Sequence, residues 1–117
     1  SLFAVDFSIN LYDSYGDGWN GGMLDITVAG ALELDDITID AGSEAIYTFT
    51  VNDGDEVVIA YTAGSYSSEN SYTVSNNIAS VIYESSAPPE ASYSFTAEVM
   101  AAETGAIAGI VTDGTDP

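Results

Sequence analysis

The residues best suited to chemistry lie in one glycine-rich stretch, residues 12–22, which reads Tyr-Asp-Ser-Tyr-Gly-Asp-Gly-Trp-Asn-Gly-Gly. Asp13 and Asp17 supply two carboxylates four positions apart, and the glycines between and after them allow the loop to turn oxygen atoms inward. Calcium in proteins binds about six to eight oxygen atoms from carboxylates, amides and backbone carbonyls. The stretch therefore predicts a calcium site with Asp13 and Asp17 as ligands, and with the Asn20 side chain and the Trp19 carbonyl as further candidates.

A turn without an ion is the alternative interpretation of this stretch, because Asp and Asn followed by Gly are common turn residues. The spacing also differs from that of the EF-hand loop. The charge of the chain favours the interpretation with a bound cation. The sequence has 19 Asp and Glu, no Lys, Arg or His, and a formal net charge of -19. Carboxylates within about 4–6 Å disfavour each other's ionisation, so two of them on one loop must either point apart into water or share a cation.

The absence of basic side chains also excludes several classes of partner. Nucleic-acid affinity depends on Lys and Arg that neutralise phosphates, and anionic membranes attract basic segments, so we expect neither partner. No apolar run reaches the roughly 18 residues of a membrane span, so we expect no membrane insertion. The lack of His and Cys excludes a Ser-His catalytic triad, a thiol nucleophile and a cysteine-ligated zinc site. A thin domain of 117 residues leaves little room for a catalytic cleft, and we expect no enzymatic activity.

The elements that must position the loop are predicted to be strands. Apolar and polar residues alternate with period two along most of the chain, which is typical of strands with one buried face. The predicted strands are residues 3–11, 24–28, 32–39, 45–51, 57–63, 72–74, 81–84, 93–99 and 106–112. Eight or nine short strands without a convincing helical period predict an all-β, antiparallel, jelly-roll-like β-sandwich with almost no helix.

Two connections between predicted strands have informative sequences. Residues 52–55, Asn-Asp-Gly-Asp, tolerate the positive φ of a tight turn and predict a β-hairpin between the strands on either side. Residues 85–90 contain Pro88 and Pro89, which cannot donate hydrogen bonds to a sheet, and predict a crossover.

Residues 12–22, together with the alternating segment 24–28, resemble the opening of a β-sandwich module repeated in large secreted and cell-surface proteins of bacteria. Residues 63–72, Ala-Gly-Ser-Tyr-Ser-Ser-Glu-Asn-Ser-Tyr, resemble the second motif of that module, and the resemblance covers about residues 5–97. It implies an extracellular, adhesin-like or structural module whose two motif loops meet at one end of the sandwich. It also implies that Glu69 joins Asp13 and Asp17 around one ion. The absence of Lys and Arg departs from the module's usual composition.

The end of the chain suggests assembly. We assign residues 1–100 to the sandwich and residues 101–117 to a linker and an extra strand, and residues 105–117 resemble the first strand and turn of a carboxypeptidase-regulatory-like β-sandwich. The extra strand either begins a neighbouring module of the same chain or pairs with another subunit, because an apolar strand without neighbours readily pairs. Self-association into a filament is thus expected to use the first or the last predicted strand. The candidate assembly residues are Phe3, Val5, Phe7, Ile107 and Ile110.

The sequence also gives expectations about the cellular location of the protein and about an alternative ligand. Calcium is millimolar outside cells, and a chain without Lys or Arg has no trypsin-type cleavage site, so both observations favour an extracellular or cell-surface location. A carbohydrate-binding module is the alternative function. In that interpretation Tyr15, Trp19 and Tyr66 stack on sugar rings, although a single Trp beside a glycine-rich loop more often packs inward as an anchor.

Overall fold

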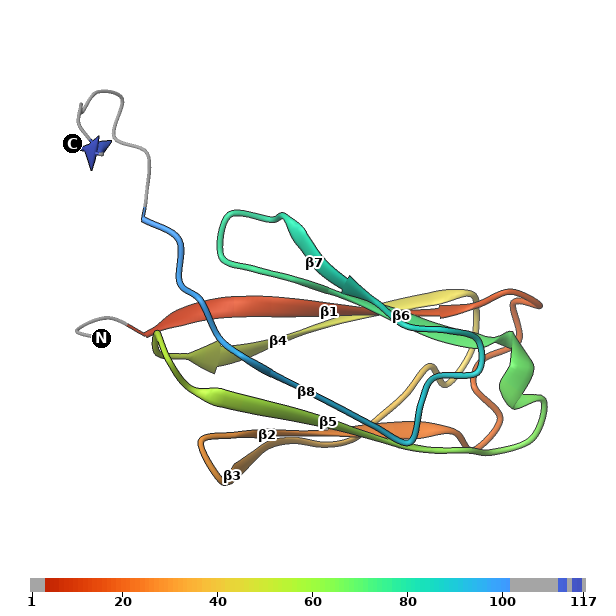
Figure 1. Cartoon of the computed structure of the whole chain (residues 1–117). Helices are drawn as coiled ribbons and strands as arrows, with labels where there is room; N and C mark the ends of the chain where they lie inside the picture. Colours follow the sequence, from red (N-terminus) through yellow and green to blue (C-terminus); the bar gives the residue numbers. More distant parts are fainter. Residues whose placement is uncertain (1–3, 102–111, 114, 117) are drawn as a thin grey trace.

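The computed structural model describes residues 4–101, 112–113 and 115–116. Two four-stranded antiparallel sheets face each other as the layers of a sandwich (Figure 1). One sheet has the strand order β4 (Glu44–Val51), β1 (Val5–Asp13), β6 (Asn70–Ser75) and β7 (Val81–Glu84). The other has the order β3 (Ala31–Ile37), β2 (Met23–Val28), β5 (Glu56–Thr62) and β8 (Ser92–Thr96). A separate pair of short strands consists of β9 (Thr112–Asp113) and β10 (Thr115–Asp116).

The all-β sandwich predicted from the sequence is confirmed. In the part of the chain that the structure describes, the one helical element is the single 3₁₀ turn η1 (Ser67–Glu69). No helix among these residues has the length and hydropathy that a membrane span requires.

The alternation in the sequence places one face of each inner strand in the core. In β1, the side chains of Phe7, Ile9 and Leu11 are fully buried, whereas the residues between them are only partly buried. Phe7 lies opposite Phe49 of β4, and the two rings meet edge to face with their centroids 6.1 Å apart. Each such side chain contributes roughly 1.5–3 kcal/mol when it leaves water, so this double layer of apolar residues is the main source of stability.

The turn at residues 52–55 forms, but the hairpin predicted around it is wrong. Gly54 has a φ of +90°, and the Asp55 N–H donates to the Asn52 carbonyl at 3.1 Å. However, β4 pairs with β1 in one sheet, whereas β5 pairs with β2 and β8 in the other. The residues of this turn favour a reversal of the chain, but the apolar faces of the two flanking strands fill the core from opposite layers. The turn therefore connects the two sheets.

The crossover predicted from the two prolines connects the sheets at the other edge. The chain leaves β7, the last strand of one sheet, and enters β8, the last strand of the other (Figure 1). Both edge strands therefore lie on the same side of the sandwich.

The prediction that the first strand offers a free edge to another subunit is wrong for most of that strand. β1 pairs with β4 from Val5 to Tyr12 and with β6 from Ser8 to Asp13, so it lies inside its sheet. Val5 is partly buried against the core, and Phe7 is fully buried in it, so the Phe7 side chain is not available to a partner. The other candidate assembly residues, Phe3, Ile107 and Ile110, lie outside the described residues, as does most of the predicted strand 106–112.

Candidate metal centre

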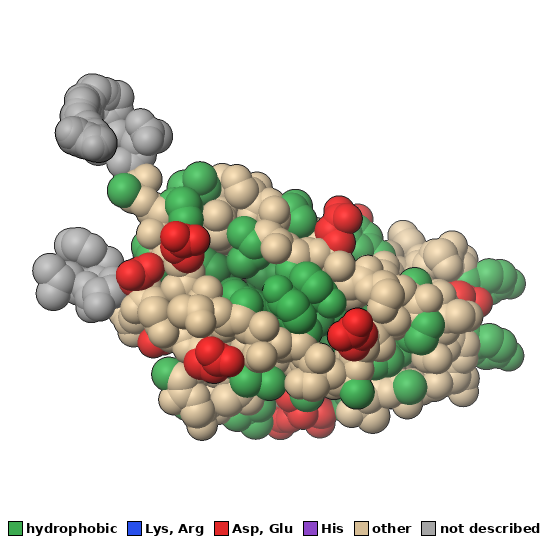
Figure 2. Space-filling model, viewed as in Figure 1, with side chains coloured by type: hydrophobic (Ala, Val, Ile, Leu, Met, Phe, Trp, Pro, Cys, Tyr) green, Lys and Arg blue, Asp and Glu red, His purple; other side chains and the backbone are tan. Residues whose placement is uncertain are grey.

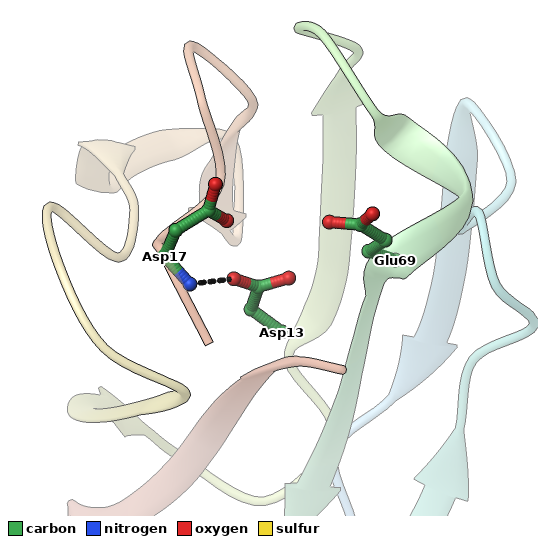
Figure 3. Close-up of side chains that lie close together, drawn as sticks. All are labelled: Asp13, Asp17 and Glu69. Carbon is green, nitrogen blue, oxygen red and sulfur yellow. Dashed lines mark hydrogen bonds between the residues drawn. The ribbon is translucent and has the colours of Figure 1, made fainter. Parts of the chain in front are cut away.

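Asp13, the last residue of β1, organises the loop that follows it. Its side chain points inward and is only 3% exposed. Its Oδ2 accepts hydrogen bonds from the backbone N–H groups of Gly16, Asp17 and Gly18 at 3.0, 2.7 and 2.7 Å, and its Oδ1 accepts one from Tyr15 at 3.3 Å. Figure 3 shows the bond from Asp17. The glycine-rich loop is thus wrapped around a single carboxylate.

The ionisation of Asp13 follows from these bonds. Burial raises the pKa of Asp13, but the N–H groups of Tyr15, Asp17 and Gly18 stabilise the ionised form and together outweigh burial. The pKa of Asp13 consequently lies below its ordinary value of 3.8. A negative charge is therefore fixed at the base of the loop at neutral pH.

Trp19 anchors the far side of the loop. Its side chain is fully buried, its Nε1 donates to the Tyr12 carbonyl at 2.8 Å, and its ring meets that of Tyr61 edge to face at 5.8 Å. The neighbouring Gly18 has a φ of +95°, and a Cβ there would lie 2.7 Å from the Ile39 carbonyl oxygen. A buried ring cannot stack on a sugar, so the prediction that Trp19 forms part of a carbohydrate platform is wrong.

The second motif loop lies directly against the first. The Ser65 N–H donates to the Asn20 carbonyl at 3.0 Å. At the same junction the backbones of Gly22 and Gly64 approach so closely that a Cβ on Gly64 would overlap the Gly22 nitrogen and the Asn20 carbonyl. Glycine is required at position 64 because the two backbones are too close to leave room for a Cβ. The two loops therefore meet at one end of the sandwich.

This junction places Glu69 beside the first loop. Glu69 ends η1 and immediately precedes β6, and its carbonyl accepts a hydrogen bond from the Ser14 N–H at 3.0 Å. Asp13, Asp17 and Glu69 each offer a carboxylate oxygen, and these atoms all lie within 4.8 Å of one another (Figure 3). The three residues expected to surround one ion are thus brought together.

The three carboxylates differ in their surroundings. Asp13 is buried, Glu69 is partly buried and Asp17 is exposed, so the cluster opens to solvent on one side. Partial desolvation, the charges of Asp13 and Asp17 and a hydrogen bond with Asp13 all raise the pKa of Glu69 above its ordinary value of 4.5. Glu69 is therefore the carboxylate whose ionisation the cluster opposes, as expected where like charges are held close together. A divalent cation would reverse that opposition.

The two lesser ligand candidates are placed differently. The Trp19 carbonyl accepts a hydrogen bond from the Gly22 N–H at 2.9 Å, within a turn. Asn20 presents its amide nitrogen, and not its oxygen, to the Asp17 carboxylate at 3.3 Å. The Trp19 carbonyl is thus engaged in the turn, and the Asn20 oxygen is not the atom that faces Asp17.

Asn70 is a further candidate metal ligand, which was not predicted from the sequence. It lies opposite Asp13 in the ladder between β1 and β6, and it is fully buried. Its Nδ2 donates to the Tyr61 hydroxyl at 2.8 Å, whereas its Oδ1 has no hydrogen-bond partner among the described residues. A buried polar atom without a partner costs about 1–3 kcal/mol, and amide oxygens are among the ligands that calcium accepts. The position of Asn70 directly after Glu69 is the sequence signal that could have identified it.

A second acidic cluster lies at the hairpin between β2 and β3. Asp25, Asp35 and Asp36 offer carboxylate oxygens within 4.8 Å of one another, and none of the three is buried. The Asp36 N–H donates to Asp25 Oδ1 at 2.7 Å, beside an irregularity in the pairing of the two strands. The charge of Asp35, partial desolvation and then Asp25 raise the pKa of Asp36 above its ordinary 3.8. The sequence shows Asp35 next to Asp36, but only the irregular register brings Asp25 to them.

The aromatic residues predicted to bind sugar are divided between core and surface. Unlike Trp19, Tyr15 and Tyr66 are 75% and 69% exposed. They line a cavity of about 330 Å³ together with Asp17 and Glu69. The two exposed tyrosines, one from each motif loop, therefore share a cavity with two of the three carboxylates of the cluster.

Comparison with known proteins gives no match, whether to a family model, to a curated protein sequence or to a solved structure.

Proposed function

We propose that this chain is an extracellular β-sandwich module with a structural or adhesive role, whose loop end is stabilised by a bound calcium ion. One observation carries the proposal. Carboxylates of Asp13, Asp17 and Glu69, from two loops far apart in the sequence, converge within 4.8 Å in a chain that has no basic side chain. The exposed members of this cluster can be neutralised only by a proton or by a cation from outside the protein.

Each carboxylate has a distinct part in the proposed site. Asp13 Oδ2 is occupied by three backbone N–H groups, which leaves Oδ1, with its single long bond, as the oxygen for the ion. Asp17 and Glu69 contribute from the two loops, so the ion joins segments otherwise held by a few backbone hydrogen bonds. Asn70 supplies a further oxygen next to Asp13. The donor set consists of oxygen atoms alone, which is the preference of calcium.

An extracellular location provides enough calcium to occupy the proposed site. Calcium sites of extracellular modules have dissociation constants of about 10⁻⁴ to 10⁻³ M, close to the calcium concentration outside cells. An ion that binds only the folded state at about 1 mM then stabilises it by roughly 0.4–1.4 kcal/mol, by mass action. Such a gain suits a building block that must hold its loops rigid after secretion. We assign it no enzymatic activity.

Calcium-dependent unfolding tests the proposal. We expect calcium to raise the melting temperature of the full chain relative to EDTA, and Asp17→Asn to remove most of that rise with little effect in EDTA. Glu56→Gln is the matched control, because Glu56 is exposed and begins β5 at the opposite end from Gly64. Equal losses in calcium and EDTA for Asp17→Asn would show that Asp17 has a structural role and is not a ligand.

A further inference from the structure

The cavity beside the three carboxylates is lined by both aromatic and acidic side chains. Its volume is about 330 Å³, and its lining residues are Tyr15, Asp17, Tyr66 and Glu69. Tyr15 and Tyr66 are the two most exposed large hydrophobic side chains of the described residues. Figure 2 shows hydrophobic side chains projecting from the end of the molecule where the motif loops lie. Two exposed tyrosines and two carboxylates thus line the same cavity.

The first motif loop contains both a buried and an exposed aromatic side chain. Trp19 is buried against Tyr61, while Tyr15, four residues earlier on the same loop, is 75% exposed. Tyrosine offers a flat apolar face and a polar tip, and such residues are common where a ligand with both kinds of surface binds. The exposed tyrosines therefore add nothing to the core but are available to a ligand.

The proposed ion would have free positions on this side. Calcium binds about six to eight oxygen atoms. Asp13 has one carboxylate oxygen saturated by backbone N–H groups, so one oxygen each from Asp13, Asp17, Glu69 and Asn70 leaves at least two positions open, unless Asp17 or Glu69 binds through both of its oxygens. Asp17 is exposed and lines the cavity, so the remaining positions face solvent there. Those positions are open to hydroxyl oxygens.

We propose that this cavity binds a neutral glycan, with sugar hydroxyl groups on the calcium ion and a ring face against Tyr15 or Tyr66. The inference rests on the calcium site proposed above. The cavity volume lies near the lower end of the range of small-molecule sites, roughly 300–1,000 Å³, which suits one or two sugar rings. A net charge of -19 opposes the approach of sialylated, sulfated or uronic-acid glycans. The ligand class is therefore neutral, and the tyrosines replace Trp19 as its aromatic surface.

A printed array of neutral and acidic glycans, read in calcium and in EDTA, provides the test. We expect the full chain to retain at least one neutral glycan in calcium and to lose it in EDTA. Tyr15→Ala and Tyr66→Ala are titrated calorimetrically with the retained glycan, and at least one should bind about tenfold more weakly. Tyr66→Phe, which keeps the ring, should bind as the unaltered chain does. Ile46→Ala removes an exposed apolar side chain, 62% exposed on β4, and should have no effect.

The outcomes separate this inference from the calcium site. The melting temperature of each tyrosine variant should rise with calcium as in the unaltered chain, because neither tyrosine is a proposed ligand. A calcium-dependent melting temperature without retention of any neutral glycan overturns the glycan site and leaves the calcium site standing. Retention that survives EDTA, or that neither tyrosine variant weakens, also overturns it. Absence of any calcium effect on melting overturns both.

Discussion

The two acidic clusters of this molecule each bring three carboxylates within 4.8 Å of one another, but their surroundings are opposite in kind. In the loop cluster, Asp13 is buried and receives four backbone N–H bonds. In the hairpin cluster, no residue is buried, and the described contacts include one such bond, from the Asp36 N–H to Asp25. Accordingly, the pKa of Asp13 is lowered. The pKa of Asp36 is raised, mainly by repulsion from Asp35. Proximity of carboxylates alone therefore does not define a site.

The clusters also differ in what they connect. Asp25, Asp35 and Asp36 belong to two adjacent strands of one hairpin, so an ion there would join segments that already pair. Asp13 and Glu69 come from loops that the sequence separates by more than fifty positions. An ion at the loop cluster would remove the freedom of two independent segments, which is where a cross-link stabilises most. The comparison thus favours the loop cluster as the calcium site.

The largest expected effect comes from separating the two loops. Gly64→Ala places a Cβ against the Gly22 nitrogen and the Asn20 carbonyl, and backbone atoms cannot move aside as a side chain can. We expect a loss of about 3 kcal/mol in the free energy of unfolding, the upper end of overpacking costs, together with loss of the calcium response. Urea unfolding with and without calcium measures both.

Gly54→Ala is the matched control for that substitution. Gly54 has a φ of +90° in the turn at the opposite end of β5, and no atom lies within 4 Å of a Cβ built there. Only backbone strain is introduced, at a cost of about 1–2 kcal/mol, and the calcium response should remain. If both variants lose the same stability and keep the calcium response, the close contact of the loops does not support the cluster.

Intermediate effects should distinguish the organising carboxylate from the other ligands. Asp13→Asn replaces an ion that accepts four N–H bonds with a neutral amide, so we expect a loss of about 2 kcal/mol even in EDTA. Asp25→Asn, in the hairpin cluster, affects one accepted bond and should cost less than ~1 kcal/mol in either condition. Thermal and urea unfolding in EDTA provide the measurement. An Asp13→Asn loss seen only in calcium would mean that the loop is folded by the ion and not by the carboxylate.

The sequence predicts the strands and the two carboxylates of the first loop better than it predicts their partners, and Glu69 is expected only from the resemblance to a known module. Strand alternation is local, so β1 and its buried Phe7 could be identified from spacing. The hairpin at residues 52–55 could not be judged, because turn chemistry does not determine which sheet the next strand joins. The burial of Trp19 depends on Tyr61, which is distant in the sequence. Properties that require register or contact between sheets were therefore missed, including the second acidic cluster.

The smallest effect concerns the pH dependence of the hairpin cluster. The folded-state pKa of Asp36 is raised above its ordinary 3.8, so the folded state binds a proton at a higher pH than the unfolded state does. Stability therefore rises as the pH falls through the raised pKa, and this gain is complete below the unfolded value of about 3.8. Asp36→Asn removes the titrating group, so the variant should be slightly more stable than the unaltered chain at neutral pH. The difference in melting temperature, measured in EDTA, should shrink as the pH approaches 4. A difference that stays constant across this range would mean that Asp36 does not feel its acidic neighbours, and the contrast with Asp13 would then rest on backbone hydrogen bonds alone.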